Sequence, residues 1–418
     1  MKIVIVGSGL MGVATAYVLQ QRGHRVVVLE RQEGPGRETS YANGTLLTPS
    51  MPEPWNAPGC WQVLLGSLCR SDAALQLHWR TLPGLADWGV EFLRNSSIAR
   101  FERNSLKNLR LALYSLKMTA AVRLQTGIEY ARIARGTLRL FREPYSLNRA
   151  DSTSHRWASE GLAFRTLSAP EAVDLEPALA PIVDELAGAI HYPNDESGDA
   201  YRFCVALAEA AGNLGVEFRF GSSVTSLAMR AGSVAGAVTE HERISGDRYV
   251  VAAGSYSVPL LRHIGVRLPV RPAKGYSVTF QRVDARPLLR VPIIDDDFHA
   301  AVVPFGEGIR VAGTAEFAGY DLTLPSRRVR NLLRLLQQVL PQARFDPGAA
   351  SAWCGLRPMS ADGVPVIGRT PISDLFVNCG HGPLGWTMAV GSAHLLADVI
   401  DGSPASVEAG DYELRRFY

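Results

Sequence analysis

The residues with the clearest chemical meaning form a glycine-rich turn near the start of the chain. Gly7-Ser8-Gly9-Leu10-Met11-Gly12 has the GxGxxG spacing. In this spacing the first glycine permits a tight turn, the second lets a pyrophosphate approach the backbone, and the third lets a helix pack closely on a strand. Backbone N–H groups at the start of such a helix attract phosphate charge. The turn therefore predicts a site for a dinucleotide.

The elements that must position this turn flank it in the expected order. Residues 2–6 form a short apolar run that predicts a strand, and residues 13–19 predict a helix. A second apolar run, Arg25 to Leu29, ends on Glu30. An acidic residue about 20 residues after the turn is placed to hydrogen-bond ribose hydroxyls. Strand, turn, helix, strand and acid together are far more specific than the glycines alone.

The length and composition indicate a globular protein and exclude several other classes. The chain has 418 residues, which suggests two or three domains, and it is 47% apolar and 20% charged, as ordinary globular proteins are. A net charge of +3 does not favour nucleic-acid binding. The five cysteines are widely spaced without a CxxC and the nine histidines are scattered, which predicts no metal site and no disulfide framework.

The sequence predicts no membrane-spanning helix, but one segment could contact a membrane surface. No apolar run reaches the roughly 18 residues of a membrane-spanning helix, and no signal peptide is recognised, so we expect a cytoplasmic protein. Residues 61–149 are expected to be a basic helical segment, because twelve Arg or Lys residues stand against four Glu between Glu91 and Arg149. Such a segment beside the apolar stretch 61–70 is either a solvated face or a peripheral contact with an anionic membrane surface.

A strand far downstream distinguishes between cofactors. The first strand–helix–strand unit alone would serve NAD or FAD equally. Residues 249–253 predict a further strand, whose small-residue end at Ala253-Gly254 can lie against a dinucleotide. A strand that returns to the same fold after an insertion favours FAD and makes the nucleotide domain discontinuous.

The fold class expected is therefore α/β, with a discontinuous Rossmann-like FAD-binding domain and an inserted α+β substrate domain. Alternating residues between 268 and 320 predict a mainly antiparallel sheet for the inserted domain. We assign residues 1–45, 198–267 and 346–418 to the FAD-binding domain. Residues 46–197 and 268–345 form the substrate domain.

A second glycine loop follows a predicted strand near the C-terminus. The loop runs from Gly380 to Thr387, directly after the apolar residues 375–379. Its backbone N–H groups could face the electron-rich N1 and C2=O side of a reduced flavin. Upstream, Glu38 to Gly44 supplies hydroxyl and amide groups that could contact a pyrophosphate or an isoalloxazine ring.

These stretches carry a family resemblance. The chain resembles the glycine oxidase and D-amino acid oxidase class of flavoenzymes, and within it the bacterial respiratory D-amino acid dehydrogenases of the small-subunit type. The pairing of Lys274-Gly275-Tyr276-Ser277 with the Gly380 loop is far narrower than any Rossmann motif. The other matching stretches are Val6–Gly12, Glu38–Asn43, Pro54–Gly59, Pro193–Asp199, Gly254–Ser257, Gly355–Pro358, Asp362-Gly363 and Gly380–Met388.

The resemblance implies an activity. A D-amino acid would lose a hydride from Cα to flavin N5, and the imino acid would hydrolyse to a 2-oxo acid and ammonia. Electrons would pass to a quinone or another acceptor than oxygen, which favours peripheral contact at the cytoplasmic face of the inner membrane. FAD is expected to bind non-covalently, because Cys354 is one residue out of register with the flavin-linking cysteine of sarcosine oxidase relatives.

The resemblance also implies residue roles. Arg357 would hold the substrate carboxylate through its planar fork. Tyr276 is a second carboxylate contact or a lid, Tyr41 is a weaker candidate, and His381 would orient the flavin or tune its charge. The expected cofactor-binding residues are Gly7, Gly9, Leu10, Met11, Gly12, Glu30, Arg31, Thr39, Ser40, Val224, Ala253, Gly254, Gly382, Pro383, Leu384, Gly385, Trp386 and Thr387.

Departures from the family pattern leave two alternatives open. Pro383 stands where relatives have threonine, and Pro304 stands where close relatives have a substrate-side arginine. Phe298 and His299 occupy a position associated with Tyr-Lys. One alternative is therefore an oxygen-using oxidase of glycine, sarcosine or a cyclic, proline-like amino acid. The other is a non-catalytic FAD-binding partner protein.

Overall fold

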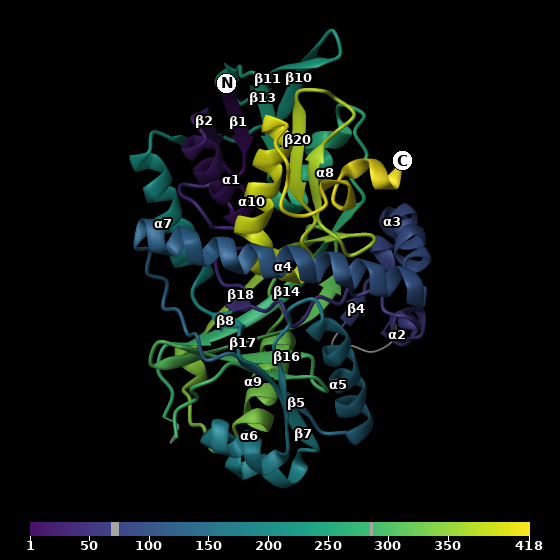
Figure 1. Ribbon diagram of the computed structural model, residues 1–418, viewed down its shortest axis with the longest axis vertical. Coiled ribbons are helices and arrows are strands. Elements are labelled where there is room, and N and C mark those ends of the chain that lie inside the picture. The colour runs from purple at the N-terminus through teal and green to yellow at the C-terminus, as the bar shows by residue number, and fades with distance from the viewer. Residues whose placement is uncertain (68–74, 285–286) are drawn as a thin grey trace.

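The computed structural model describes residues 1–67, 75–284 and 287–418. Two sheets form the centres of two lobes, and one long helix crosses the junction between them (Figure 1). One lobe holds both chain termini and a mainly parallel sheet. The other is built on a larger, mainly antiparallel sheet.

The first sheet contains the N-terminal strand at an interior position. Apolar residues on both faces of β1 are buried, as expected of a parallel strand covered by helices. β1 runs parallel to β2 on one side and to β13 on the other, so the returning strand predicted from the sequence is confirmed. The strand order is β19 (Val366–Arg369), β20 (Leu375–Cys379), β13 (Arg248–Val251), β1 (Lys2–Val6), β2 (Arg25–Leu29) and β9 (Glu217–Arg219), with only β19 antiparallel to its neighbour.

The second sheet has nine strands. Its order is β18 (Ser351–Ser360), β14 (Val270–Phe280), β17 (Gly308–Phe317), β16 (Ala300–Phe305), β15 (Ile293–Asp295), β5 (Thr137–Phe141), β7 (Gly188–Tyr192) and β6 (Arg165–Leu167), with β4 (Leu75–Leu77) beside β17. The pairs β15–β5 and β17–β4 are parallel and the others are antiparallel. Two small antiparallel sheets join β10 (Ser226–Arg230), β11 (Ser233–Val238) and β12 (Arg243–Ile244), and β3 (Leu46–Leu47) with β8 (Glu196–Ser197).

The helices cover these sheets. The mainly parallel sheet carries α1, which packs between α7 and α10, while α9 packs against β14 and β17 of the large sheet. Asp199 caps α7 by accepting hydrogen bonds from the backbone N–H groups of Tyr201 and Arg202. The helices are α1 (Leu10–Gln21), α2 (Cys60–Ser67), α3 (Leu82–Arg94), α4 (Ile98–Thr126), α5 (Pro144–Ala158), α6 (Ala169–Leu175), α7 (Ala200–Asn213), α8 (Ser257–Arg262), α9 (Ser326–Val339) and α10 (Gly385–Asp401).

Two elements pack in a different part of the fold from the one that the expected domain boundaries assign to them. β18 follows residue 346 but hydrogen-bonds along β14 in the large sheet, so the nucleotide fold resumes only at β19. α4, expected in the substrate domain, packs against α10. The contact is close because Gly391 of α10 has no side chain: a Cβ there would lie 2.6 Å from the Cβ of Ser115.

At least seven of the fourteen Arg and Lys side chains in residues 61–149 form ion pairs within the chain. The pairs are Arg94–Glu91, Lys107–Asp411, Arg110–Glu160, Arg123–Glu196, Arg132–Glu196, Arg139–Asp296 and Arg142–Glu185. Much of this charge therefore holds elements together. Among the described residues, no helix combines the length and apolar character needed to cross a membrane.

Candidate active site

A cavity of about 1990 Å³ lies between the two lobes. Its walls include the ends of β1, β2 and β13, the start of α10, and strands β14, β17 and β18 of the large sheet. This volume is about twice the upper end of the range for pockets that bind drug-sized ligands. The cavity can therefore hold a large cofactor together with a second small molecule.

The nucleotide end of the cavity is formed by the first glycine turn. Gly7 has a φ of 103°, which favours glycine. A Cβ on Gly12 would lie 1.8 Å from the carbonyl oxygen of Gly7, so Gly12 is required by the packing of α1 on β1. α1 begins after Gly9 without a side-chain cap. Gly7, Gly9, Leu10 and Met11 line the cavity. The Leu10 N–H donates to the Ser40 hydroxyl, and the N–H groups that follow it in the first helical turn are available to a phosphate.

Glu30 and Arg31 line the same end. The Glu30 carboxylate is buried and accepts hydrogen bonds from the backbone N–H (2.7 Å) and the hydroxyl (2.9 Å) of Ser8. Arg31 pairs with Glu38 at 2.6 Å, and its Cζ lies 3.8 Å from the centre of the Tyr256 ring. Val224, Ala253 and Gly254 complete this part of the wall.

Two hydroxyl groups connect the nucleotide fold to the large sheet. Ser40 accepts a hydrogen bond from the backbone N–H of Leu10 at 3.3 Å, and Thr39 donates to the carbonyl of Leu356 at 2.9 Å. Ser255 donates to that same carbonyl at 3.2 Å. These bonds fix the start of the Arg357 segment against the cofactor side of the cavity.

The second glycine loop supplies another uncapped helix start. Gly380 and Gly382 have φ values of 82° and 55°, and α10 begins without a side-chain cap. Gly382, Pro383, Leu384, Gly385 and Trp386 all line the cavity. The first-turn N–H groups of α10 carry a partial positive charge that suits an electron-rich ring edge.

His381 is held neutral beside this loop. The side chain is buried, and burial lowers its pKa to about 3. Nε2 lies 2.8 Å from the Ser392 hydroxyl, whereas Nδ1 has no hydrogen-bond partner. The indole N–H of Trp386 is also buried without a partner. Both residues line the cavity, and both offer a hydrogen bond that the protein itself does not use.

These features fit FAD. The capless starts of α1 and α10, the Gly7–Gly12 contact and the orphaned polar atoms of His381 and Trp386 all border one continuous cavity. Cys354 is absent from the cavity wall, and its thiol contacts the Leu322 carbonyl at 3.2 Å. Non-covalent binding agrees with this placement.

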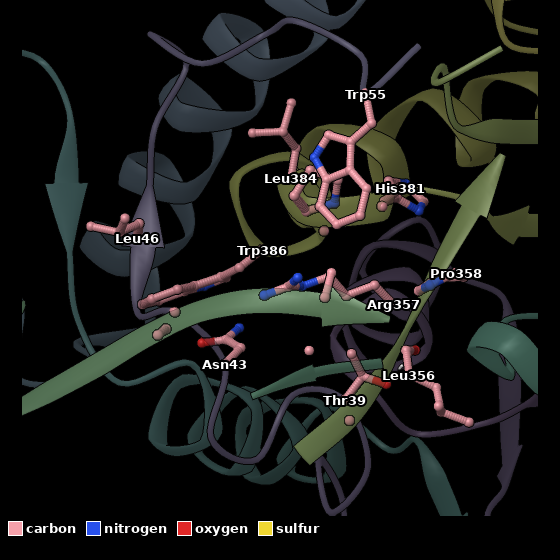
Figure 2. A pocket seen from close by; sticks show the side chains of 18 of the residues that line it. Thr39, Asn43, Leu46, Trp55, Leu356, Arg357, Pro358, His381, Leu384 and Trp386 are labelled. Atoms are coloured by element: carbon pink, nitrogen blue, oxygen red, sulfur yellow. Dashed lines mark hydrogen bonds between the residues drawn. The ribbon is translucent and has the colours of Figure 1, made fainter. Parts of the chain in front are cut away.

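Arg357 extends into the cavity from β18, with Trp55 nearby (Figure 2). Its Cζ lies 5.8 Å from the centre of the Trp55 ring. Among the described residues no carboxylate pairs with the guanidinium, and burial lowers its pKa to about 10. The side chain therefore stays charged at neutral pH, in a site that lacks a protein counter-ion.

Gly275 makes room for this guanidinium. It lies on β14 and pairs with Gly355 of β18, two residues from Arg357. A Cβ on Gly275 would lie 2.5 Å from Cζ of Arg357. The Lys-Gly-Tyr-Ser motif marks this position in the sequence, but its function depends on a cross-strand contact that sequence spacing does not show.

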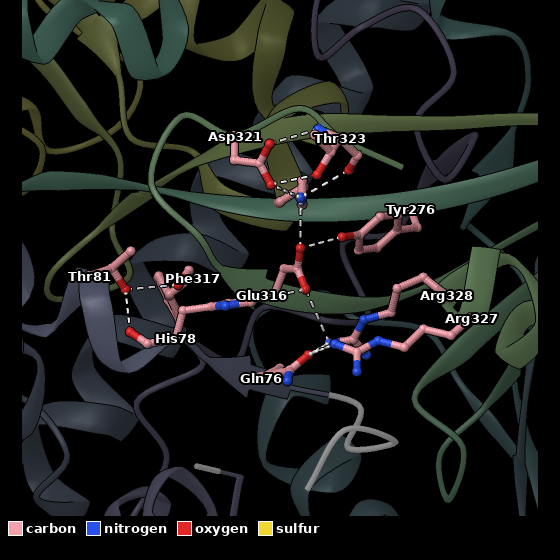
Figure 3. Close-up of polar contacts among 11 residues, drawn as sticks. Gln76, His78, Thr81, Tyr276, Glu316, Phe317, Asp321, Thr323, Arg327 and Arg328 are labelled. Carbon is pink, nitrogen blue, oxygen red and sulfur yellow. Dashed lines mark hydrogen bonds and ion pairs between the residues drawn. The ribbon is translucent and has the colours of Figure 1, made fainter. Parts of the chain in front are cut away.

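Tyr276 is bound to the protein rather than free in the cavity. Its ring touches the cavity wall, but its hydroxyl donates to Glu316 (Figure 3). Glu316 also pairs with Lys274 at 2.7 Å and with Arg328 at 3.4 Å. Burial alone would raise the pKa of Glu316, but hydrogen bonds from Lys274 and Tyr276 lower it to about 2. In this arrangement the Tyr276 hydroxyl does not contact a substrate.

Three predicted site residues lie off the cavity wall. The side chain of Tyr41 is largely exposed, and its ring packs edge-on against Tyr201 with 4.9 Å between centroids. Gly12 acts through helix packing. The buried Thr387 hydroxyl accepts a hydrogen bond from the backbone N–H of Thr48 at 3.0 Å. Tyr41, Gly12 and Thr387 therefore do not line the cavity with the other predicted site residues.

Several wall residues were not predicted. Asn43 lies in the Glu38–Gly44 segment that was expected to contact the cofactor, although the residue was not singled out. Thr314 belongs to a strand whose polar residues look ordinary in the sequence. Thr314 has a φ of 52° and a buried hydroxyl without a partner. The remaining unpredicted polar or aromatic wall residues considered below are Glu53, Trp55, Arg139, Trp157 and Asp296.

Metal ligands are not gathered anywhere in residues 1–67, 75–284 and 287–418, where no group of three or more His, Cys, Asp or Glu side chains could hold an ion. The four cysteines of the described chain are free thiols, and Cys69 lies outside the described residues.

Comparison with known proteins agrees with this geometry. The sequence matches the FAD-dependent oxidoreductase family over residues 2–399. It is 39% identical over 417 residues to a D-amino acid dehydrogenase of Allorhizobium ampelinum, covering 100% of this chain and 99% of that protein.

Solved structures share the fold. A glycine oxidase from Geobacillus kaustophilus superimposes with a TM-score of 0.77 at 24% identity, covering 99% of this chain and 97% of that one. An L-proline dehydrogenase from P. horikoshii gives 0.76 at 18% identity, covering 100% and 97%. The family match over nearly the whole sequence and a cavity large enough for a dinucleotide lead to one conclusion: the chain belongs to the FAD-dependent oxidoreductase family and is a FAD-binding redox enzyme.

Proposed function

We propose that this enzyme oxidises D-amino acids to imino acids, which hydrolyse to 2-oxo acids and ammonia, and that it passes electrons to an acceptor other than oxygen. The observation that carries the proposal is the Arg357 guanidinium, which faces the cavity and pairs with no carboxylate in the described part of the chain. The 39% identity to a D-amino acid dehydrogenase supports the choice of substrate. Bound FAD supplies the hydride acceptor.

Arg357 binds the substrate carboxylate in this proposal. A planar guanidinium matches a carboxylate with two parallel hydrogen bonds. The site is desolvated, so an incoming carboxylate supplies the negative charge that the protein does not. Fixing the carboxylate holds Cα at a set place relative to the cofactor, which is the positioning that hydride transfer needs.

The substrate amine is expected to bind in its neutral form. His381 has a pKa of about 3 and is a weak base. The Tyr276 hydroxyl donates to Glu316, and burial raises its pKa. Since neither group takes the proton, we expect kcat/KM to increase with pH until the amine of the free substrate is deprotonated.

Substitution of Arg357 tests the proposal. One charge-assisted pair contributes about 1.5–3 kcal/mol, so Arg357→Ala should raise KM for D-amino acids roughly 10- to 150-fold while FAD remains bound. Arg357→Lys keeps the positive charge but loses the planar guanidinium, so its KM should lie between those of wild type and Arg357→Ala. Normal turnover by Arg357→Ala would disprove the assignment. A wild-type protein whose flavin no D-amino acid reduces would favour the non-catalytic partner.

Oxygen use separates the dehydrogenase from the oxidase alternative. The flavin is first reduced anaerobically with a D-amino acid and then exposed to air, with an artificial quinone added in a parallel sample. The dehydrogenase should reoxidise fast with quinone and slowly in air. Fast reoxidation in air with one equivalent of peroxide would establish an oxidase, and glycine, sarcosine and proline would then be compared as substrates.

We also propose that the protein makes a peripheral contact with an anionic membrane surface. Exposed apolar side chains lie on or beside α2, α3 and the start of α4, namely Trp61, Leu82, Val90, Leu93 and Ile98. Apolar side chains of this kind insert at a bilayer surface. The protein should co-sediment with anionic vesicles at low salt, and replacement of Trp61 and Ile98 by serine should reduce binding. No binding at low salt would rule the contact out.

A further inference from the structure

The cavity has a second charged group, away from the glycine loops. Glu53, Arg139 and Asp296 all line it. Glu53 belongs to the segment before α2, Arg139 to β5, and Asp296 follows β15. None of the three has a part in holding FAD or the substrate carboxylate as described above.

Only two of these three side chains form an ion pair with each other. Nε of Arg139 donates to Oδ1 of Asp296 at 2.8 Å, and Nη2 of Arg139 donates to the same oxygen. The charge of Arg139 is therefore neutralised by Asp296. Among the described residues no basic side chain lies within ion-pair distance of Glu53, so its carboxyl group has no ion-pair partner of its own.

The indole N–H of Trp157 is a donor near the Glu53 carboxylate. It lowers the pKa of Glu53 but makes no hydrogen bond of ordinary geometry. Burial raises the pKa of Glu53, and the nearby Arg139 lowers it only in part. A buried carboxylate in a cavity is stabilised when a ligand supplies a cation or a strong hydrogen-bond donor.

Glu53 belongs to the same segment as Trp55, which lies beside Arg357. It is two residues before Trp55, and two residues of extended chain span about 7 Å at most. The ring of Trp55 lies 5.8 Å from Cζ of Arg357. The cavity is therefore lined by a group that suits a carboxylate, Arg357, by the Trp55 ring beside it, and by the Glu53 carboxylate on the same segment as Trp55.

We propose that Glu53 is a specificity-determining residue that binds the cationic end of the substrate side chain, so that basic amino acids such as D-arginine and D-lysine are the preferred substrates. Arg357 takes the α-carboxylate, Trp55 covers the aliphatic part of the side chain, and Glu53 takes the guanidinium or ammonium. This inference rests on the function proposed above. Arg149 and Arg334 line the same cavity, and if they governed specificity an acidic substrate would be favoured instead.

Steady-state kinetics test the proposal. D-arginine, uncharged D-methionine and acidic D-glutamate are compared in wild type and Glu53→Gln, which keeps the size of the side chain and removes its charge. We expect kcat/KM for D-arginine to fall about 10- to 100-fold and that for D-methionine to change less than about 3-fold. Glu102→Gln is the matched control, because Glu102 lines the cavity but already pairs with Arg156.

A binding measurement provides a readout that does not depend on turnover. δ-Guanidinovalerate is D-arginine without the amino group, and hexanoate lacks the guanidinium as well, so neither can be oxidised. The wild-type holoenzyme should bind δ-guanidinovalerate at least 10-fold more tightly than hexanoate, measured by thermal shift. This measurement decides the matter alone if Glu53→Gln fails to fold.

The outcomes separate the two proposals. Oxidation of D-methionine with equal or better use of D-glutamate than D-arginine would overturn the role of Glu53 and leave the proposed function intact. An equal loss for D-arginine and D-methionine in Glu53→Gln would also overturn it. Failure of all three substrates to reduce the flavin would overturn the proposed function itself.

Discussion

The guanidinium of Arg357 lies directly over the backbone of Gly275 on the neighbouring strand. A Cβ at Gly275 would be 2.5 Å from Cζ and 2.7 and 2.8 Å from the two terminal nitrogens of Arg357. Real Cβ contacts are not this short, so any side chain at position 275 must displace the arginine or the strand. The position of the carboxylate-binding group is therefore set by a residue with no side chain.

Gly275→Ala should impair substrate binding without loss of FAD. Moving the guanidinium breaks its bidentate geometry, and we expect KM for D-amino acids to rise roughly 10- to 150-fold. A double-mutant cycle with Arg357→Ala measures the coupling. In the Arg357→Ala background the Gly275 substitution should have almost no further effect on KM. A full additional loss in that background would show that Gly275 acts through something other than Arg357.

The hydroxyl of Tyr276 should matter for stability more than for catalysis. Tyr276→Phe removes one hydrogen bond to the buried, charged Glu316, which should cost about 1.5–3 kcal/mol of unfolding free energy. Glu316→Gln should cost more, about 3–5 kcal/mol, because buried Lys274 and Arg328 lose their shared counter-ion. Chemical denaturation of the holoenzyme measures both. A Tyr276→Phe enzyme of unchanged stability but tenfold higher KM would instead place the hydroxyl at the substrate.

Local patterns in the sequence were sufficient for the nucleotide fold. The strand, glycine turn, helix and second strand depend on neighbours within about thirty residues, and the structure has each of them where the pattern predicts it. The family match confirms the fold class and the cofactor. Arg357 was predicted from the family resemblance and lines the cavity.

Long-range pairing was harder to predict. β18 is apolar and precedes β19 closely, so its neighbours in sequence suggest the nucleotide fold, whereas its hydrogen bonds go to β14 about 80 residues earlier. Tyr41 lies beside predicted cofactor residues, yet its side chain points outward to Tyr201. The Gly275 contact and the position of Glu53 beside the Arg139–Asp296 pair require knowledge of which side chains meet across elements. No spacing rule within one segment contains that information.

Asp195 should make stability depend on pH. Its buried carboxyl group accepts hydrogen bonds from the hydroxyls of Ser50 (2.5 Å) and Thr137 (2.6 Å), but burial outweighs them and raises its pKa from 3.8 to about 7. A carboxyl group whose pKa is higher in the folded state binds more protons when folded. The stability that it contributes is therefore present below about pH 4 and is lost as pH rises toward 7. Asp195→Asn should remove this dependence, so its melting temperature relative to wild type should increase between pH 5 and 8. A constant difference across that range would mean that Asp195 stays ionised.

Replacing the second and the third glycine of the first turn, Gly9 and Gly12, by alanine should have different effects. At Gly9 the nearest protein atom to a new Cβ is the Ser40 hydroxyl oxygen at 3.6 Å, an ordinary contact, so Gly9→Ala should fold normally. The methyl group would occupy space on the cavity side, and FAD should bind at least tenfold more weakly. At Gly12 the new Cβ would meet the Gly7 carbonyl oxygen at 1.8 Å, so Gly12→Ala should separate α1 from β1 and destabilise the apoprotein as well. Flavin content after purification, together with melting of the apoprotein, distinguishes the two. A Gly9→Ala apoprotein that melts as early as Gly12→Ala would mean that Gly9 also serves packing, and normal FAD affinity in Gly9→Ala would place the pyrophosphate away from this turn.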